Sequence, residues 1–545
     1  MSSAWSRWEL RSPLAEVAAR YYAEKFWTDA SFGELVDAQL REHAAHEFRV
    51  WSDVRPYRGT LADVHVLARR FAGSLAARGV RAGDVLAFQL PNWVEAAVCY
   101  WGGALLGAVI VPIVHFYGPK ELQFILGDVS PRVYVTAARF RSHDYLENLS
   151  ALAAELADVE IVAVVGGLAP SGMRPFDGLM EGDPVDGAAR VDPAMPAVIP
   201  YTSGTTANPK GVIMTHRGLE GECRQMTTPI PQLAGRPNLT AAPIGHGGGM
   251  LGALTYTLFR GGGTDIHLVD TWQPANILRV LEEGDLSFGG GAPYFFTTLL
   301  DAPEFRDHHL QHVRTAGFGT TMTPPAVIDR ARGLGIMTSR MYGSTEQPST
   351  TCASFDDDPS KRYTEGRAMP GVELRIVDDA GRPLPVDEPG EVLSRGPELF
   401  AGYTDRALTA RALDAEGWYH TGDVGSLDAE GYLTISDRKA DVIIRGGENV
   451  SAAEVEDALL RLDAIAEVAV VGAPDERLGE HGCAFLRLQA GTTPPDLEAL
   501  RAHLAEIGLA RQKWPEELRV VDDFPRTASG KIKKAELRAQ LRAGG

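Results

Sequence analysis

Residues 201–212 have the sequence Tyr201-Thr-Ser-Gly-Thr-Thr-Ala-Asn-Pro-Lys-Gly-Val212, directly after the apolar stretch Ala197-Val-Ile-Pro200. Gly204 and Gly211 lack a Cβ, so they permit tight turns that aim successive backbone N–H groups at an anion. Further donors come from one lysine and four hydroxyls: Lys210, Thr202, Ser203, Thr205 and Thr206. This composition predicts a polyphosphate-binding loop, although the spacing of a Walker A loop is missing. The alternative is a surface turn rich in glycine, serine and threonine.

Six further motifs follow this run in a defined order. They are Ala242-Pro-Ile-Gly-His-Gly247 with His246, Tyr342-Gly-Ser-Thr-Glu346, Glu365-Gly-Arg-Ala-Met-Pro-Gly371, Tyr419-His-Thr-Gly-Asp423, Ser436-Asp-Arg-Lys-Ala-Asp-Val-Ile-Ile-Arg-Gly-Gly447 and Pro525-Arg-Thr-Ala-Ser-Gly-Lys531. In identity, order and spacing the set resembles the adenylate-forming superfamily, which comprises acyl- and aryl-CoA synthetases, the adenylation domains of nonribosomal peptide synthetases, and firefly luciferase. The chain is most similar to the acyl-CoA synthetases. The resemblance covers nearly the whole chain, and the N-terminal sixty residues are the least diagnostic part.

The resemblance implies a reaction in two steps: a carboxylate and ATP give acyl-AMP and pyrophosphate, and a thiol, that of CoA, then displaces AMP. The first step brings together two anions, so it needs cations and preorganised donors around the α-phosphate more than a general base. By resemblance, Lys531 bridges the substrate carboxylate and the α-phosphate. Taken alone, Lys531 is indistinguishable from a solvated lysine beside Lys533 and Lys534.

The resemblance also assigns the nucleotide contacts. Glu346 is expected to hold Mg²⁺, which prefers hard oxygen ligands, and Thr345 to donate to the α-phosphate. Asp423 is expected to accept hydrogen bonds from the ribose hydroxyls, because a carboxylate offers two acceptor oxygens, with Arg438 nearby. The expected nucleotide-binding set is completed by the phosphate loop (Thr202, Ser203, Gly204, Thr205, Thr206, Lys210) and by Tyr342, Gly319 and Thr320 at the adenine.

The acyl and CoA contacts follow from the same resemblance. The acyl group is expected beside His246, Gly247 and Gly319, and the pantetheine of CoA beside Gly446 and Gly447. Relatives that activate amino acids carry an aspartate just after the position of His246, whereas this chain has Gly247-Gly-Gly249. Amino acids are therefore disfavoured as substrates.

The chain also departs from the family pattern. Ala207 replaces a glycine of the phosphate loop, and Phe318-Gly-Thr-Thr321 replaces the usual Gly-Gly-Ala-Pro segment at the adenine. Little loss of phosphate binding is expected from Ala207, which keeps the loop small. The two threonines leave the acyl specificity open.

The composition is that of a soluble enzyme. The chain has 545 residues, 44% hydrophobic and 23% charged, and a net charge of −19, which disfavours binding to nucleic acid or anionic membranes. Its four cysteines are far apart, so reduced thiols in a cytoplasm are expected rather than disulfides. The expected partner is a small carboxylate substrate, without nucleic acid or stable membrane insertion, and a homodimer is left open. The cluster His308-His-Leu-Gln-His312 has i, i+4 spacing suited to a metal, but a solvated helix end is favoured.

The predicted fold class is α/β. Strands at 85–90, 108–113, 132–136 and 161–165 alternate with amphipathic helices at 61–78 and 145–157, which predicts largely parallel sheets. The apolar region 85–113 is predicted to be strand, helix and strand rather than a membrane span, because it contains polar residues. We expect a large N-terminal domain of parallel-rich α/β layers, residues 1–436, with a small β-rich unit at about 372–435. A small α+β C-terminal domain, residues 437–545, is expected to be mobile about a hinge at Asp437.

These expectations describe an ATP-dependent acyl-CoA synthetase acting on a fatty, alicyclic or aryl acid. One alternative is an acyl-AMP ligase that loads a carrier protein. Another is an inactive nucleotide-binding homologue, against which the joint retention of Lys531, Glu346, Asp423 and Lys210 argues.

Overall fold

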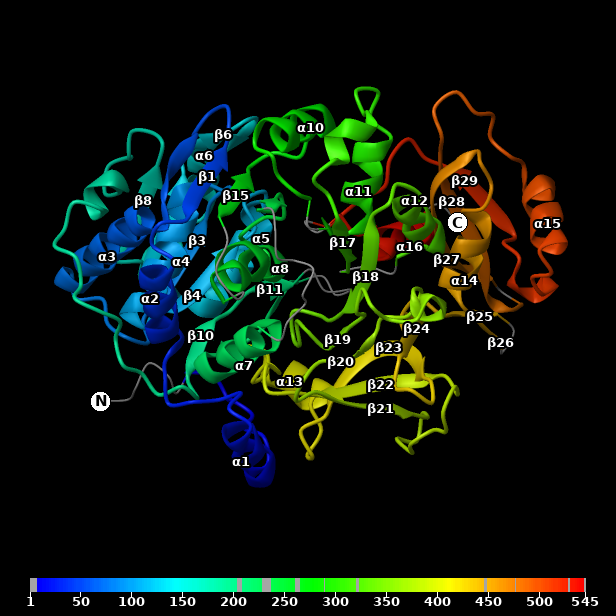
Figure 1. Cartoon of the computed structure of the whole chain (residues 1–545), viewed down its shortest axis with the longest axis horizontal. Coiled ribbons are helices and arrows are strands. Elements are labelled where there is room, and N and C mark those ends of the chain that lie inside the picture. Colours follow the sequence, from blue (N-terminus) through cyan, green and yellow to red (C-terminus); the bar gives the residue numbers. More distant parts are fainter. Residues whose placement is uncertain are drawn as a thin grey trace.

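The structure is a computed structural model. It describes residues 7–202, 208–227, 237–259, 265–288, 290–319, 323–445, 448–475, 477–527 and 530–543. The arrangement of its helices and strands is shown in Figure 1.

The centre of the N-terminal part is the unit predicted from the apolar region 85–113. β3 (Val85–Gln89), α4 (Val94–Leu106) and β4 (Val109–Ile113) follow one another, and every residue of α4 is buried. Gly102 and Gly103 allow this helix to lie close to its neighbours, since a Cβ on them would lie 2.8 Å from the ring of Phe71 and 2.9 Å from Ile110. Each glycine costs helix stability of about 1 kcal/mol relative to alanine, so close packing is the reason for their presence. Among the described residues, no helix is both long and apolar enough to cross a membrane.

Seven of the described strands form a largely parallel sheet around this unit, in the order β13-β10-β4-β3-β5-β8-β9. The sheet confirms the predicted α/β class. Its other strands are β5 (Val133–Ala137), β8 (Ile161–Val165), β9 (Arg174–Pro175), β10 (Pro196–Val198) and β13 (Met214–Thr215). The helices of this region are α1 (Ala15–Ala23), α2 (Phe32–Glu42), α3 (Leu61–Ala77), α5 (Pro119–Val129), α6 (Tyr145–Ala151) and α7 (His216–Thr227). The predicted helix 145–157 is shorter in the structure, because residues 152–157 form turns.

A second sheet has the order β14-β15-β1-β2. Its strands are β14 (Leu239–Thr240), β15 (Ile266–Val269), β1 (Glu47–Trp51) and β2 (Tyr57–Thr60). Between β14 and β15, a continuous helical segment is formed by α8 (Gly247–Met250), a π-helical turn (Leu251–Thr255) and α9 (Tyr256–Phe259).

A third sheet, β16-β17-β18-β19-β20, joins parallel strands to antiparallel ones. Its strands are β16 (Gly290–Gly291), β17 (Thr315–Phe318), β18 (Met337–Tyr342), β19 (Thr351–Cys352) and β20 (Arg367–Ala368). The helices around it are α10 (Pro274–Glu283), α11 (Pro293–Leu300), a 3₁₀ helix (Asp307–Leu310) and α12 (Pro325–Gly333).

The predicted β-rich unit is an antiparallel sheet, coloured yellow to light green in Figure 1. It consists of β21 (Glu373–Val377), β22 (Gly390–Arg395), β23 (Tyr419–Leu427) and β24 (Leu433–Arg438), with α13 (Arg406–Ala412) beside β23. β24 continues through the polar residues to Arg438, because Asp437 and Arg438 pair with Val424 and Asp423 of β23.

The C-terminal elements form an α+β unit, coloured orange to red in Figure 1. Its sheet contains β26 (Glu448–Val450), β25 (Ile443–Arg445), β28 (Gly479–Leu488), β27 (Ile465–Asp475) and β29 (Glu517–Val520). Its helices are α14 (Ala452–Leu459), α15 (Leu497–Glu506) and α16 (Lys534–Ala543). The hairpin of β27 and β28 is long, since its ladder extends to the pair Asp475 and Gly479.

Candidate active site

Three parallel strands of the third sheet end at a common edge. β16, β17 and β18 end at Gly291, Phe318 and Tyr342. Gly319, next after β17, lies so close to β18 that a Cβ would be 3.2 Å from the carbonyl oxygen of Met341. In open α/β sheets, ligands bind in the crevice outside the carboxyl ends of the strands. The expected adenine contacts Gly319 and Tyr342 therefore lie where this fold binds ligands.

The Asp423 carboxylate is held by two residues that were predicted to contact the same nucleotide. The Tyr342 hydroxyl donates a hydrogen bond of 2.7 Å to Oδ2 of Asp423, and Arg438 Nε lies 2.9 Å from Oδ1. Asp423 is buried, and Arg438 is its cross-strand neighbour in the β23–β24 ladder. Opposite charges directly across a ladder stabilise the pair. The structure thus brings together the end of β18 and the last strand of the β-rich unit at one carboxylate.

Glu346 is linked to the phosphate loop through Tyr403, a residue that no motif singled out. The Tyr403 hydroxyl donates a 2.7 Å hydrogen bond to Oε1 of Glu346, while the Lys210 ammonium lies 5.6 Å from the centre of the Tyr403 ring. Burial, and then the charge of Glu346, raise the pKa of Tyr403, so its hydroxyl remains a donor. Glu346 thus offers a carboxylate held in place by a hydroxyl, and carboxylate oxygens are the hard ligands that suit a hydrated Mg²⁺.

The two ends of the predicted phosphate loop are paired. Thr202 lies opposite Lys210 in the two-stranded sheet of β11 (Tyr201–Thr202) and β12 (Lys210–Gly211). Gly211 is tightly packed, because a Cβ there would lie 2.8 Å from Thr404 and from the Tyr201 ring. The predicted site residues that lie outside the described residues are Ser203, Gly204, Thr205, Thr206, Thr320, Gly446 and Gly447.

Lys531 comes from the C-terminal unit but lies among charges of the N-terminal part. Burial, followed by the charge of Arg438, lowers the pKa of Lys531 to about 8, whereas the charges of Asp423 and Glu346 act in the opposite direction. The same lysine charge acts on His246, whose pKa is lowered to about 4, mainly by burial. His246 is therefore neutral near neutral pH. The predicted catalytic lysine and the predicted ribose, metal and acyl contacts occupy one region.

The start of the helical segment at His246 faces the turn that carries Glu346. His246 caps this segment by accepting a hydrogen bond of 3.2 Å from the Gly248 N–H to its Nδ1. A Cβ on Gly247 would lie 3.2 Å from Cγ2 of Thr345. Gly249 is more tightly constrained, since its Cβ would lie 2.1 Å from the carbonyl oxygen of Pro243. Of these two glycines, Gly249 is thus required by close backbone approach.

The C-terminal unit contacts α11 of the N-terminal part near Lys531, and two ion pairs lie within residues 437–545. Arg538 of α16 forms a 2.7 Å ion pair with Asp441, which follows β24, and Lys534 forms one with Glu456. The Arg526 guanidinium lies 4.4 Å from the centre of the Tyr294 ring of α11, against which Gly530 also packs. Tyr294 is a second residue that no sequence motif identified. Asp437 is buried, and burial is the largest influence on its pKa, which is raised.

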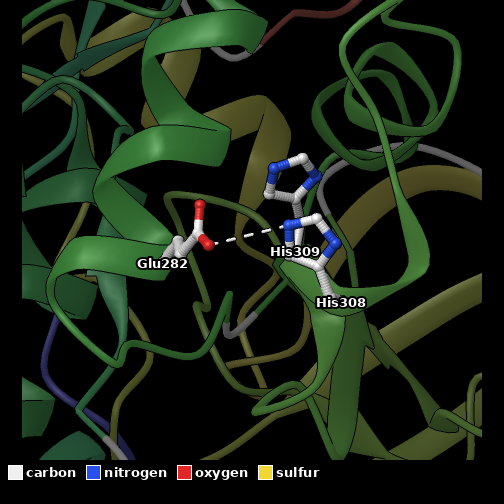
Figure 2. Close-up of side chains that lie close together, drawn as sticks. All are labelled: Glu282, His308 and His309. Atoms are coloured by element: carbon white, nitrogen blue, oxygen red, sulfur yellow. Dashed lines mark ion pairs between the residues drawn. The ribbon is translucent and has the colours of Figure 1, made fainter.

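A separate cluster lies on the surface beside α10. Figure 2 shows Glu282 facing His308 and His309, whose ligand atoms and that of Glu282 all lie within 4.8 Å of one another. The cluster does not contain the pair His308 and His312 of the i, i+4 pattern, since His312 forms an ion pair with Asp285. His308 and Glu282 already form an ion pair at 3.6 Å, and Nδ1 of His309 accepts from the Arg306 N–H. The cluster involves none of the predicted active-site residues.

Comparison with known proteins agrees with this geometry. The family model for AMP-binding enzymes matches residues 36–404, and the model for their C-terminal domain matches residues 454–531. The chain is 33% identical over 527 residues to a medium-chain fatty-acid–CoA ligase of Escherichia coli (strain K12), covering 96% of this chain and 92% of the relative. It is 33% identical to an indoleacetate–CoA ligase of Aromatoleum aromaticum, covering 87% and 91% of the two chains.

Among solved structures, ATP-bound MatB from Rhodopseudomonas palustris superposes with a TM-score of 0.83 at 26% identity, covering 94% of this chain and 99% of that one. The resemblance inferred from the motifs is thereby confirmed. The chain belongs to the AMP-binding enzymes of the adenylate-forming superfamily and is an acid–CoA ligase most similar to the acyl-CoA synthetases.

Proposed function

We propose that this chain couples ATP cleavage to the formation of an acyl-CoA thioester from a carboxylic acid that is not an amino acid. The observation that carries the proposal is the place of Lys531, whose charge interacts with those of Asp423, Arg438 and Glu346. A C-terminal lysine thus lies among the predicted ribose and metal contacts of the N-terminal part, and next to His246.

In the first step, a carboxylate oxygen of the acid attacks the α-phosphorus of ATP. A new P–O bond forms, the bond to the β-phosphate oxygen breaks, and pyrophosphate leaves. Lys531 lies between the incoming carboxylate and the α-phosphate and lowers their repulsion. Thr345 donates to the α-phosphate, and Asp423 accepts from the ribose hydroxyls. The loop with Thr202 and Lys210 at its ends holds the β- and γ-phosphates.

Mg²⁺ is the metal that this donor set fits, with Glu346 as its protein ligand and Tyr403 as the group that orients the carboxylate. When bound, Mg²⁺ neutralises part of the phosphate charge and favours departure of pyrophosphate.

In the second step, the CoA sulfur attacks the acyl carbonyl carbon, a C–S bond forms, and AMP leaves with the electron pair of the C–O bond. Residues 437–545 then act as a domain that turns about Asp437 relative to residues 1–436. This rotation removes Lys531 and brings Gly446 and Gly447 to the pantetheine. Domain closure and reopening of this kind allow one cleft to serve two reactions.

The acid is a fatty, alicyclic or aryl acid. Gly247, Gly248 and Gly249 follow His246, so no carboxylate stands there to pair with an α-ammonium group. The relatives named above act on medium-chain fatty acids and indoleacetate. We place the enzyme in the cytoplasm, where ATP, Mg²⁺ and CoA are available, and leave a homodimer open.

The test is pyrophosphate release by the full chain with ATP, Mg²⁺ and a panel of carboxylic acids, each with and without CoA. Sustained turnover that requires one class of acid and CoA supports the proposal. A burst that stalls in the presence of CoA favours loading of a carrier protein. Absence of release with every acid favours an inactive nucleotide-binding homologue.

A further inference from the structure

Glu222, a buried residue, contacts the end of the turn that carries Glu346, and one of its carboxyl oxygens has no hydrogen-bond partner among the described residues. Glu222 of α7 accepts two hydrogen bonds on Oε1, from the hydroxyls of Tyr256 and Ser349, both at 2.5 Å. Its Oε2 atom has no hydrogen-bond partner among the described residues, although Glu222 is 1% exposed. A buried acceptor without a partner is costly, on the order of 1–3 kcal/mol, so this oxygen requires an explanation.

Two segments of the chain, the walls of the acyl pocket, begin at the reaction centre and end at Glu222. One wall is the helical segment from Gly247 to Tyr256, and the other is the turn from Thr345 to Ser349. The walls meet at their near ends, where Gly247 faces Thr345. They meet again at their far ends through Glu222, which bonds Tyr256 and Ser349. At 1.5 Å per residue, Gly247 and Tyr256 are roughly 13 Å apart along the helix.

The helical wall leaves open space between these ends. Gly248, Gly252 and Tyr256 recur every four residues and therefore share one face of the helical segment. Among the described residues, a Cβ on Gly252 would have no heavy atom within 4 Å, and a Cβ on Gly248 would meet only the His246 ring. Gly252 and Tyr256 are partly exposed and Gly248 is exposed. The open face therefore runs from His246 to Tyr256, whose hydroxyl donates to Glu222.

The chemistry of Glu222 restricts what can bind at this end. Burial raises the pKa of Glu222 to about 7, so both protonation states occur near neutral pH. Because Oε1 already accepts two O–H groups, the proton of the acid form resides on Oε2, which then donates. In the carboxylate form, Oε2 accepts. A hydroxyl group is the simplest partner for both forms, since it donates and accepts.

We propose that the acyl pocket ends in a polar subsite, formed by Glu222 with Tyr256 and Ser349, that binds a hydroxyl group on the end of the acid remote from its carboxylate. The inference rests on the proposed function and narrows its substrate class to hydroxylated acids. The neighbouring Glu398 provides the contrast. It is equally buried, but its two oxygens accept from Gln347 at 2.7 Å and Gln225 at 2.8 Å, and it therefore has a structural role only.

The experiment compares pairs of straight-chain acids of graded length, unsubstituted or hydroxylated at the terminal carbon, by the kcat/KM for pyrophosphate release with ATP, Mg²⁺ and CoA. At the matching length, we expect the wild-type chain to prefer the hydroxylated acid by about tenfold or more. Glu222→Met, which retains bulk but no polar atom, is expected to abolish this preference. Glu222→Gln is expected to keep it, because the amide oxygen accepts from Tyr256 and Ser349 while the amide N–H donates to the substrate. Glu398→Gln is the matched control and is expected to leave the preference unchanged.

The outcomes separate the two proposals. Turnover of both acids with a ratio near one at every length overturns the subsite and leaves the acyl-CoA synthetase standing. Absence of pyrophosphate release with every straight-chain acid, while alicyclic or aryl acids turn over, overturns the subsite as assigned and leaves the proposed function standing. Absence of release with alicyclic and aryl acids as well overturns both. If Glu222→Met does not fold, the wild-type ratio of kcat/KM for the hydroxylated and unsubstituted acids decides. Loss of the preference in Glu398→Gln but not in Glu222→Gln also contradicts the assignment of the subsite to Glu222.

Discussion

The hydroxyl of Tyr342 and the carboxylate of Asp423 are joined by a 2.7 Å hydrogen bond between two different sheets. Tyr342 ends the third sheet, whereas Asp423 belongs to the β-rich unit, and the second oxygen of Asp423 is held by Arg438. The carboxylate therefore has a fixed orientation before any nucleotide binds. Such preorganisation reduces the entropy cost of binding.

We predict that Asp423→Asn raises the KM for ATP by about tenfold, the effect of losing a charged acceptor for a hydroxyl pair. Tyr342→Phe should have a smaller effect of about threefold, since it removes only the orienting hydroxyl. Steady-state kinetics at saturating acid and CoA measure the KM for ATP of both variants. The double variant completes a double-mutant cycle, which shows whether the two effects are coupled. If the two effects are strictly additive, Tyr342 does not act through Asp423.

The contact between Tyr403 and Glu346 predicts a dependence on Mg²⁺. In Tyr403→Phe the Glu346 carboxylate loses its 2.7 Å partner, so we expect the Mg²⁺ concentration for half-maximal activity to rise by about tenfold. Tyr432→Phe is the control, because its hydroxyl also donates at 2.7 Å to a carboxylate, that of Asp357, away from the predicted site. An equal effect of both variants would show that Tyr403 has no specific relation to the metal.

Because the loop of Lys531 packs on the Tyr294 ring, we predict that loss of this ring slows the first step alone. Arg526 lies over this ring at 4.4 Å, and Gly530, next to Lys531, packs against it. Tyr294→Ala should therefore slow pyrophosphate release by about tenfold, while thiolation of supplied acyl-AMP is unchanged. Tyr294→Phe retains the ring and should behave as wild type. Equal loss of both half-reactions would mean that Tyr294 supports folding rather than the docked position of the lysine loop.

The lowered pKa of Lys531 predicts a pH profile. The charged ammonium is the active form, which is present below the pKa and lost as the pH rises through about 8. The kcat/KM for pyrophosphate release should accordingly fall tenfold per pH unit above that value. Lys531→Arg stays charged throughout this range, so its lower activity should not show the same decline. A wild-type profile that is flat to pH 10 would contradict the assigned protonation state.

Much of the fold was predictable because its signals are local. The buried unit of β3, α4 and β4 was expected from an apolar run, and α3 begins with a capping box of Thr60 and Asp63. Other features depend on strand pairing, which local composition does not reveal. Polar residues from Ser436 to Arg438 continue β24 because β23 offers them ladder partners, and Pro474 is accommodated in the long hairpin opposite Glu480.

The candidate site was predictable to the extent that it consists of family motifs. Tyr342, Asp423 and Arg438 were assigned to one nucleotide, and the structure brings them together. Tyr403, Tyr294 and Glu222 were missed, because each acts through a partner more than 50 residues away in sequence: Glu346, Arg526 and Ser349. One signal was available, the acidic pair Glu220-Gly-Glu222, whose two glutamates are buried on α7 in the structure.

The most direct test of the account is the separation of the two half-reactions in Lys531→Ala. The account predicts that pyrophosphate release from ATP and acid falls by two orders of magnitude or more, while the conversion of supplied acyl-AMP and CoA to acyl-CoA and AMP retains the wild-type rate. Equal loss of both half-reactions, or adenylation at a near wild-type rate, would contradict the role of Lys531 as the cation of the first step.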